Sequence, residues 1–292
     1  MPSLILSLDG GGIRGVAVVQ FLKRLESILD TPIHELFDTF IGTSVGGLIA
    51  IKLASGDSVG DCVDFCTRDN MMAIMDKSWW DKITPVQFSP KYDGTGIKEV
   101  VGKYIKKIPL NKCKKKLLIT GYNLNKHDTR IFKSAVDDID LQTLGLITSA
   151  APTYFPCIEY KGEWYMDGGI GANNPTMVSY VDATEGKDDF KILSIGTGFK
   201  NVMIDGEQAT NWGVFEWLKH NIANIAFDAP LRLIDRNVKK LLGKRYLRID
   251  GVCENMCMDD TSIGNVKALR RMGDEWFEKN EDKLREFFVI KD

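Results

Sequence analysis

Short hydrophobic runs alternate along this chain with longer stretches in which apolar residues recur about every 3.6 positions. Residues 3–8 form a strand-like run that ends in a cluster of glycines. The apolar residues of 18–29 then repeat at helical spacing until a proline-containing turn at 30–32 stops them. A second strand is predicted at about 37–42, and the almost uncharged run 48–53 after it is typical of a buried helix. The pattern therefore predicts two strand–helix units in succession.

The same alternation continues toward the C-terminus. An apolar stripe from Val266 to Phe288 predicts a closing helix that packs on the sheet. Strands that alternate with helices indicate an α/β fold with a largely parallel sheet. No linker, repeat or low-complexity tract divides the sequence, so we expect one domain over residues 1–292. The remaining predicted elements are strands at 116–123, 129–133, 191–195 and 245–249 and a helix at 174–183.

Composition limits the classes of function. The 292 residues carry 38 Lys plus Arg against 40 Asp plus Glu, and this balance argues against a nucleic-acid polymer as partner. The 3 histidines are few, and the 6 cysteines lack the C-x-x-C spacing of a zinc site, so we expect reduced thiols and no metal. Neither a signal peptide nor a membrane-spanning run is recognisable, so we expect a cytoplasmic protein.

A glycine-rich turn, Asp-Gly-Gly-Gly-Ile-Arg-Gly at 9–15, joins the first strand to the first helix. Because no side chains intervene, its backbone N–H groups can point into one concavity that attracts negative charge. Gly10, Gly12 and Gly15 also fit the G-x-G-x-x-G pattern of dinucleotide-binding loops. A dinucleotide site needs an acidic residue after the second strand, whereas Glu35 precedes that strand. A dinucleotide is therefore disfavoured, and an oxyanion site or a simple tight turn remains.

A second motif, Gly42-Thr43-Ser44-Val45-Gly46, lies between a predicted strand and the buried helix. Glycines two residues before and after a serine permit a sharp elbow that lifts the hydroxyl above the sheet. Because the expected strand–turn–helix context accompanies the motif, we predict that Ser44 is a nucleophile and that Gly42 and Gly46 support its turn.

A serine nucleophile needs a base. His34 and His127 lie in predicted turns and His220 lies in a helical pattern, where solvated histidines are common. Asp167 follows a short strand-like run, and there it could form an Asx turn or reach the edge of the sheet where Ser44 lies. A triad of Ser44, Asp167 and His220 would follow the chain order of α/β-hydrolases. Nothing around His220 indicates the loop on which that fold carries its histidine.

The three motifs, in this order, resemble those of patatin-like phospholipases. Three further segments, 148–156, 194–198 and 258–262, agree with the resemblance, which covers nearly the whole chain. It implies a three-layer α/β/α sandwich with a mostly parallel central sheet. It also implies a hydrolase that releases fatty acids from phospholipids or related lipids and that uses no histidine, metal or cofactor.

The resemblance also implies roles for individual residues. Ser44 would be the nucleophile and Asp167 the general base, with the oxyanion hole formed by the backbone amides of Gly10, Gly11 and Gly12, chiefly the latter two. Arg14 either anchors this loop or forms a surface salt bridge, and Gly168 supports the turn after the base. Because a solvated aspartate has a pKa of about 3.9, we expect Asp167 to be partly buried within hydrogen-bonding reach of Ser44.

A phospholipid substrate implies contact with a membrane surface. Seven lysines between Val100 and Leu117, with no acid among them, could meet anionic headgroups, although such a run is more often a solvated face. Trp79-Trp80 with Phe88, and a second group of Trp212, Phe215 and Trp217, are candidate interfacial aromatics; core packing is preferred for the second group. A small-molecule or protein activator remains open, as does a silent lipid-binding module in place of an enzyme.

Overall fold

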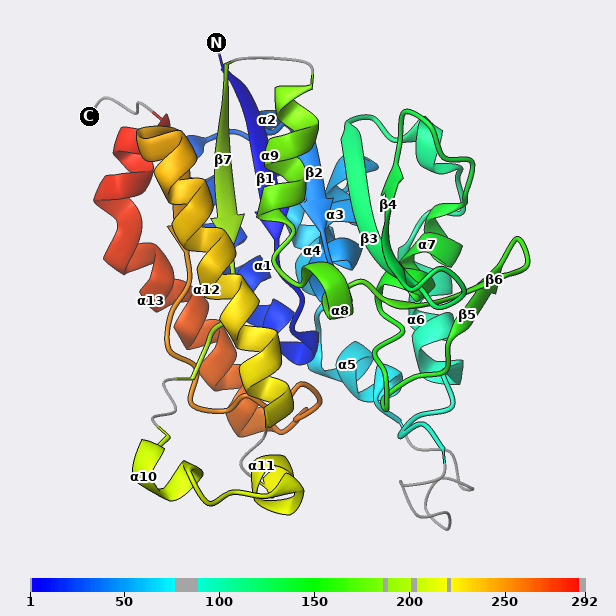
Figure 1. Cartoon of the computed structure of the whole chain (residues 1–292). Coiled ribbons are helices and arrows are strands. Elements are labelled where there is room, and N and C mark those ends of the chain that lie inside the picture. Colours follow the sequence, from blue (N-terminus) through cyan, green and yellow to red (C-terminus); the bar gives the residue numbers. More distant parts are fainter. Residues whose placement is uncertain (1, 77–88, 186–188, 201–203, 220–221, 289–292) are drawn as a thin grey trace.

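The computed structural model of the protein contains one mixed sheet with helices around it (Figure 1). It describes residues 2–76, 89–185, 189–200, 204–219 and 222–288. The strands in this described part are β1 (Ser3–Leu8), β2 (Thr39–Gly42), β3 (Lys116–Asn123), β4 (Asp128–Lys133), β5 (Ile158–Tyr160), β6 (Glu163–Asp167), β7 (Phe190–Ile195) and β8 (Tyr246–Ile249). The helices are α1 (Gly15–Leu29), α2 (Ile33–Leu36), α3 (Val45–Ala54), α4 (Val59–Phe65), α5 (Arg68–Ile74), α6 (Thr95–Tyr104), α7 (Leu141–Thr148), α8 (Gly169–Ala172), α9 (Thr176–Thr184), α10 (Gly206–Ala209), α11 (Val214–Lys219), α12 (Ile222–Leu242) and α13 (Ile263–Phe288).

The strands follow the order β5-β6-β3-β2-β1-β7-β8, and β4 pairs with β3 outside this path. The run β3-β2-β1-β7-β8 is parallel, whereas β4, β5 and β6 join by antiparallel pairing. The register places Leu8 of β1 beside both Gly42 of β2 and Ile195 of β7. The carboxyl ends of these three strands therefore form one row at one edge of the sheet, and the predicted parallel arrangement is confirmed for its centre.

Most predicted elements appear within two or three residues of their expected bounds. The strands expected at 3–8 and 116–123 match β1 and β3, and the second strand begins at Thr39. The predicted buried helix extends over Val45–Ala54, and every residue in it is buried. Strand β5 was not predicted, because its three residues carry too little alternation to be recognised.

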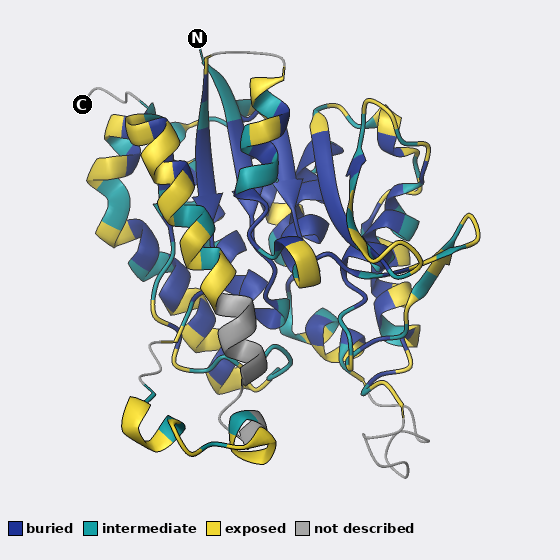
Figure 2. Ribbon diagram, in the orientation of Figure 1, coloured by how far each residue is buried: buried dark blue, intermediate teal, exposed yellow. Residues whose placement is uncertain are grey.

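Helices cover both faces of the sheet, and this arrangement confirms the predicted three layers (Figure 1). On β1, Ile5 joins the smaller apolar cluster beneath α9 and α12, whereas Leu6 and Leu8 join the larger core with α1, α3 and α13. Strand β7 repeats this division with Ile192 and Leu193. Successive strand residues point to opposite faces, so one short strand supplies both cores. Figure 2 shows that the central strands are buried and that the outer faces of the helices are exposed.

The last helix closes the larger core, as the apolar stripe predicted. Trp276 and Phe277 of α13 are buried, and the ring of Phe277 lies 6.2 Å from that of Phe21 on α1. Gly273 lets the two helices approach closely, because a Cβ there would lie 2.5 Å from the carbonyl oxygen of Ala17. This contact holds α1, and with it the glycine-rich turn that precedes α1, against the rest of the core.

A largely buried arginine joins the carboxyl ends of β1, β7 and β8. Arg248 of β8 donates two hydrogen bonds to the Asp9 carboxylate, at 3.0 and 2.6 Å. It also donates to the carboxylate of Asp250 and to the hydroxyl of Ser194, each at 2.7 Å. Burial raises the pKa of Asp9, and the paired guanidinium opposes that rise. The pair therefore keeps a buried carboxylate charged next to the glycine-rich turn.

We predict that Arg248→Met lowers the free energy of unfolding by about 3–5 kcal/mol at pH 8, because it leaves buried carboxylates without their cation. The exposed pair of Arg271 and Glu275, 3.5 Å apart, provides the control. Arg271→Met is expected to change the same quantity by no more than about 1 kcal/mol. Urea unfolding measures both variants, and equal effects would contradict the structural role assigned to Arg248.

Candidate functional site

Ser44 stands at the tip of a sharp turn between β2 and α3. Its backbone has φ 55° and ψ −128°. Such a conformation costs a residue other than glycine roughly 1–3 kcal/mol. A Cβ at Gly46 would lie 2.5 Å from the carbonyl oxygens of both Leu8 and Asp9, so α3 can begin this close to β1 only with glycine there. Gly42 is restricted in the same way, because a Cβ there would lie 2.5 Å from the carbonyl carbon of Gly46.

Asp167 lies at the end of β6, where antiparallel pairing sets it opposite Gly121 of β3. The hydroxyl of Ser44 donates a hydrogen bond to the Asp167 carboxylate. The N–H of Gly169 donates to Asp167 Oδ1 at 2.7 Å, so the Asx turn and the contact with Ser44 exist together. Burial raises the pKa of Asp167 to about 6, and the hydrogen bonds from Ser44 and Gly169 oppose this rise. The structure thus brings the two predicted catalytic side chains into direct contact.

The glycine-rich turn lies directly beside this pair. The N–H of Gly10 donates to the carbonyl oxygen of Asn173 at 3.1 Å, so it is already occupied. Within the described residues, the N–H groups of Gly11 and Gly12 donate to no protein acceptor. Gly12 has φ 58°, which glycine adopts without strain. Of the three predicted oxyanion donors, Gly10 is therefore occupied, whereas Gly11 and Gly12 donate to no acceptor in the described part of the chain.

Arg14 is buried beneath the glycine-rich turn, with 7% of its surface exposed. Its Nε donates to the Gly11 carbonyl oxygen at 3.2 Å, and its Nη1 donates to the Gly198 carbonyl oxygen at 2.9 Å. Of the two roles considered for this side chain, the surface salt bridge is wrong. Arg14 therefore ties the turn to the segment that follows β7.

Each of the three supporting segments contributes at least one hydrogen bond to the site. The hydroxyl of Thr148 accepts the Ser44 N–H at 3.0 Å. The hydroxyl of Thr197 donates to the Gly10 carbonyl oxygen at 2.7 Å, and the carbonyl oxygen of Met258 accepts the Ile13 N–H at 2.9 Å. The sequence did not predict these roles for the individual residues, although all three residues lie in segments that agree with the family resemblance. The contact of Asn173 with the turn had no signal in the sequence.

Gly168 is fixed by the strand next to it, since a Cβ there would lie 2.5 Å from the Cβ of Thr120 on β3. The hydroxyl of Thr120 is 2.8 Å from that of Thr43, beside the nucleophile elbow. These contacts join the turn after Asp167 to the turn that carries Ser44.

The comparison with known proteins agrees with this geometry. The sequence model of the family described as "Patatin-like phospholipase" matches residues 6–180, a stretch that contains the glycine-rich turn, the serine elbow and Asp167. The chain belongs to the patatin-like phospholipases. "Patatin-like protein 4" of Arabidopsis thaliana is 27% identical to it over 94% of this chain and 83% of the relative. A "cGAMP-activated phospholipase" of Pseudomonas aeruginosa is 25% identical over 92% of this chain and 86% of the relative.

A solved structure shows the same fold. The crystal structure of VipD from Legionella pneumophila superposes with a TM-score of 0.59 at 12% identity, over 98% of this chain and 67% of the VipD chain. The patatin-like family and these relatives assign the protein to the lipid hydrolases.

The histidines of this patatin-like chain offer no described partner for Ser44. His34 lies on α2, which precedes β2 at the opposite edge of the sheet from Ser44, and His127 is exposed between β3 and β4. His220 lies outside the described residues. Glu35 also lies on α2, before β2, so the acidic residue of a dinucleotide site is not at the end of that strand.

The lysine run lies far from the predicted dyad. Its last members lead into β3, at the amino edge of the parallel strands, whereas Ser44 follows β2 at the carboxyl edge. Lys106 forms an ion pair with Asp57 at 2.5 Å, and Lys116 forms one with Asp182 at 2.5 Å. A bilayer held by this run would face the wrong edge of the sheet for Ser44.

The two groups of candidate interfacial aromatics differ. Trp79, Trp80 and Phe88 lie outside the described residues. Trp212 and Trp217 pack edge to face with ring centroids 5.0 Å apart, whereas Phe215 is 83% exposed. The preference for core packing is therefore wrong for Phe215.

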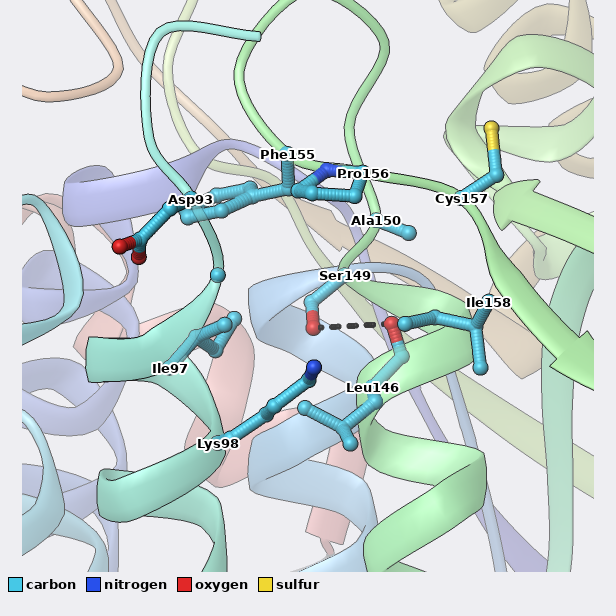
Figure 3. A pocket seen from close by; sticks show the side chains of 11 residues that line it. Asp93, Ile97, Lys98, Leu146, Ser149, Ala150, Phe155, Pro156, Cys157 and Ile158 are labelled. Carbon is cyan, nitrogen blue, oxygen red and sulfur yellow. Dashed lines mark hydrogen bonds between the residues drawn. The ribbon is translucent and has the colours of Figure 1, made fainter. Parts of the chain in front are cut away.

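A mainly apolar pocket of about 330 Å³, its open mouth included, lies between α6, α7 and the segment that leads into β5 (Figure 3). The carbonyl oxygen of Ala150 in its wall accepts the N–H of Asp167 at 2.9 Å. The hydroxyl of Ser149 in the same wall is satisfied by the Gly145 carbonyl oxygen at 2.7 Å, so it is not a second nucleophile. Most of the remaining lining is apolar: Ile97, Leu146, Phe155, Pro156 and Ile158.

Among the described residues, no three His, Cys, Asp or Glu side chains gather as a metal site would require. No helix of the described ranges is both long enough and apolar enough to cross a bilayer.

We predict that Gly46→Ala abolishes the close contact of α3 with β1, because backbone carbonyls cannot move aside as a flexible side chain can. The rate of lipid hydrolysis should fall at least about a hundredfold, since a misplacement on the order of 1 Å has that effect on a catalytic group.

Gly102→Ala, in α6, is the matched control, because nothing lies within 4 Å of a Cβ there. It should keep full activity and gain about 0.5–1 kcal/mol of stability as measured by urea unfolding. Equal activity of the two variants would refute the packing argument.

Proposed function

We propose that this protein releases fatty acids from membrane phospholipids, with Ser44 as nucleophile, Asp167 as general base and the Gly11 and Gly12 amides as the oxyanion hole. The observation that carries the proposal is the hydrogen bond between Ser44 and a buried carboxylate, beside two unoccupied N–H groups. This arrangement meets the geometric needs of acyl transfer: a nucleophile, a base in contact with it, and donors for the developing charge.

In the first half of the reaction, Ser44 Oγ attacks the ester carbonyl carbon and its proton passes to Asp167. The carbonyl oxygen becomes negative and is stabilised by the amides of Gly11 and Gly12, each typically worth about 2.7–4 kcal/mol. Collapse of the intermediate breaks the ester bond, and the departing alcohol takes the proton from Asp167. The acyl group remains on Ser44.

In the second half, Asp167 accepts a proton from water as that water attacks the acyl-enzyme. The fatty acid leaves, and the proton returns from Asp167 to the Ser44 oxygen. The chain's own groups balance every proton in this scheme, so it calls for no metal or cofactor. A carboxylate whose pKa lies near 6 is mostly ionised at neutral pH and is a stronger base than a solvated aspartate.

The direct test compares fatty-acid release from mixed phospholipid vesicles by the wild type, Ser44→Ala, Asp167→Asn and His220→Ala. We expect Ser44→Ala and Asp167→Asn to release fatty acid at least about a thousandfold more slowly than the wild type, because nucleophile and base act as one unit. His220→Ala should retain activity, since the proposed proton path does not include it. Thermal unfolding followed by circular dichroism establishes that each variant is folded.

Other outcomes identify the alternatives. An inactive but folded His220→Ala protein would replace the dyad with a triad. Fluorophosphonate labelling that persists in Ser44→Ala would place the nucleophile elsewhere. Vesicle binding without hydrolysis by the wild type would indicate a silent lipid-binding module. Because the Pseudomonas relative is described as cGAMP-activated, the wild type is assayed with and without that nucleotide before silence is concluded.

The raised pKa of Asp167 predicts the pH dependence. Asp167 must be ionised to accept the serine proton, so kcat/KM on a soluble ester should rise as pH increases and level off above a midpoint near 6. The rate of ester hydrolysis is measured at each pH, and circular dichroism at the same pH establishes that the protein is folded. Loss of rate through unfolding is then not mistaken for protonation of Asp167. A midpoint near 4 would show a solvated carboxylate and would contradict the burial argument.

A further inference from the structure

The segment 204–219, which we call the α10–α11 arm, stands away from the body of the molecule (Figure 1). At its tip Val214 is 74% exposed and Phe215 is 83% exposed. Adjacent apolar side chains this exposed are unusual for a segment that has only water around it, since aromatic side chains lose most by exposure.

The arm is ordered by contacts of its own. The backbone N–H of Trp212 donates to the carbonyl oxygen of Ala209 at 3.1 Å, and the backbone N–H of Trp217 donates to that of Gly213 at 3.1 Å. The edge-to-face packing of Trp212 on Trp217 joins the turn to the helix. Phe215 therefore extends from a segment whose conformation is stabilised by the contacts of Trp212 and Trp217.

The arm lies at the edge of the sheet where the predicted dyad lies. It follows β7, which ends at Ile195 in the row formed with Leu8 and Gly42, two residues before Ser44. Figure 1 shows α10 and α11 beyond the carboxyl ends of β1 and β7, on the side toward which those strands run. A flat surface that meets the arm therefore also faces the edge that carries Ser44.

We propose that the α10–α11 arm docks the protein on a phospholipid bilayer by inserting Val214 and Phe215 among the lipids, with Trp212 and Trp217 at the level of the headgroups. The choice of a bilayer rests on the proposed function, because the substrate must then approach this edge. The large apolar side chains that the arm exposes in its described part are Val214 and Phe215, whereas a stable protein interface needs about 800 Å² from each partner.

Charge specifies the kind of bilayer. The arm contains Asp205, Glu207 and Glu216, all exposed, against one lysine. Anionic lipids would repel this surface, so docking depends on apolar insertion and favours zwitterionic lipids. This is the opposite of what the lysine run at the other edge of the sheet would favour.

The test uses Phe215→Ser, with Val136→Ser as the matched control. Val136 is 77% exposed, and it follows β4 beside the start of β3, at the amino edge of the sheet. Both variants are placed on Ser44→Ala so that lipid is not consumed, and binding to phosphatidylcholine vesicles is measured by co-sedimentation. Phe215→Ser should lower the ratio of bound to free protein at least about tenfold, as expected when an aromatic side chain that would be buried among lipids is removed. Val136→Ser should leave it unchanged.

A second measurement separates docking from catalysis. With Ser44 present, Phe215→Ser should reduce fatty-acid release from the same vesicles by a similar factor and leave hydrolysis of p-nitrophenyl butyrate unchanged. Equal losses on both substrates would show that the arm supports the site, and unchanged vesicle binding would show that it does not dock; either result overturns the inference.

Two further results would also overturn it. One is binding restricted to anionic vesicles, and the other is a dimer in sedimentation velocity that Phe215→Ser dissociates. Failure of the proposed function looks different: the wild type would bind vesicles through the arm and hydrolyse neither ester.

Discussion

The site depends on how closely the start of α3 approaches the end of β1. Gly46 lies directly on the carbonyl groups of Leu8 and Asp9, with no room for a methyl group between them. Because that contact is made backbone to backbone, the serine elbow and the glycine-rich turn occupy one small volume. The proposed mechanism depends on this closeness, because the N–H groups of Gly11 and Gly12 and the hydroxyl of Ser44 must reach the same ester group.

Two buried aspartates follow strands in this molecule, and their neighbours give them different chemistry. Asp9 receives two hydrogen bonds from a guanidinium, so its negative charge is neutralised and serves to hold three strands together. Asp167 receives hydrogen bonds from a hydroxyl and a backbone N–H, both neutral, and burial raises its pKa to about 6. Burial raises the pKa of both carboxyls to about 6, so the difference lies in their partners: a guanidinium binds both oxygens of Asp9, whereas Asp167 adjoins the hydroxyl that the proposed mechanism deprotonates.

The orientation that we propose for the molecule on a lipid surface depends on an apolar feature and not on charge. The lysine run is the most prominent charge feature of the sequence, yet it lies at the amino edge of the sheet and two of its members are held in ion pairs with Asp57 and Asp182. The exposed Phe215 lies at the other edge, where Ser44 lies. An apolar tip of two residues carries little weight in composition, but its position at the edge where Ser44 lies is what the proposed docking requires.

The sequence by itself determined the local features of this protein. The periods of its apolar residues predicted β1, α1 and α13, because such periods report which face of an element is buried, and the almost uncharged run 48–53 predicted the buried helix α3. The spacing of glycines around Ser44 and after β1 predicted two sharp turns, since only glycine fits such turns. What only the tertiary structure decided was which turns meet. The contact of Ser44 with Asp167, the occupation of the Gly10 amide by Asn173 and the burial of Arg14 join residues far apart in the chain, and their geometry comes from strand order and register, which local patterns do not encode.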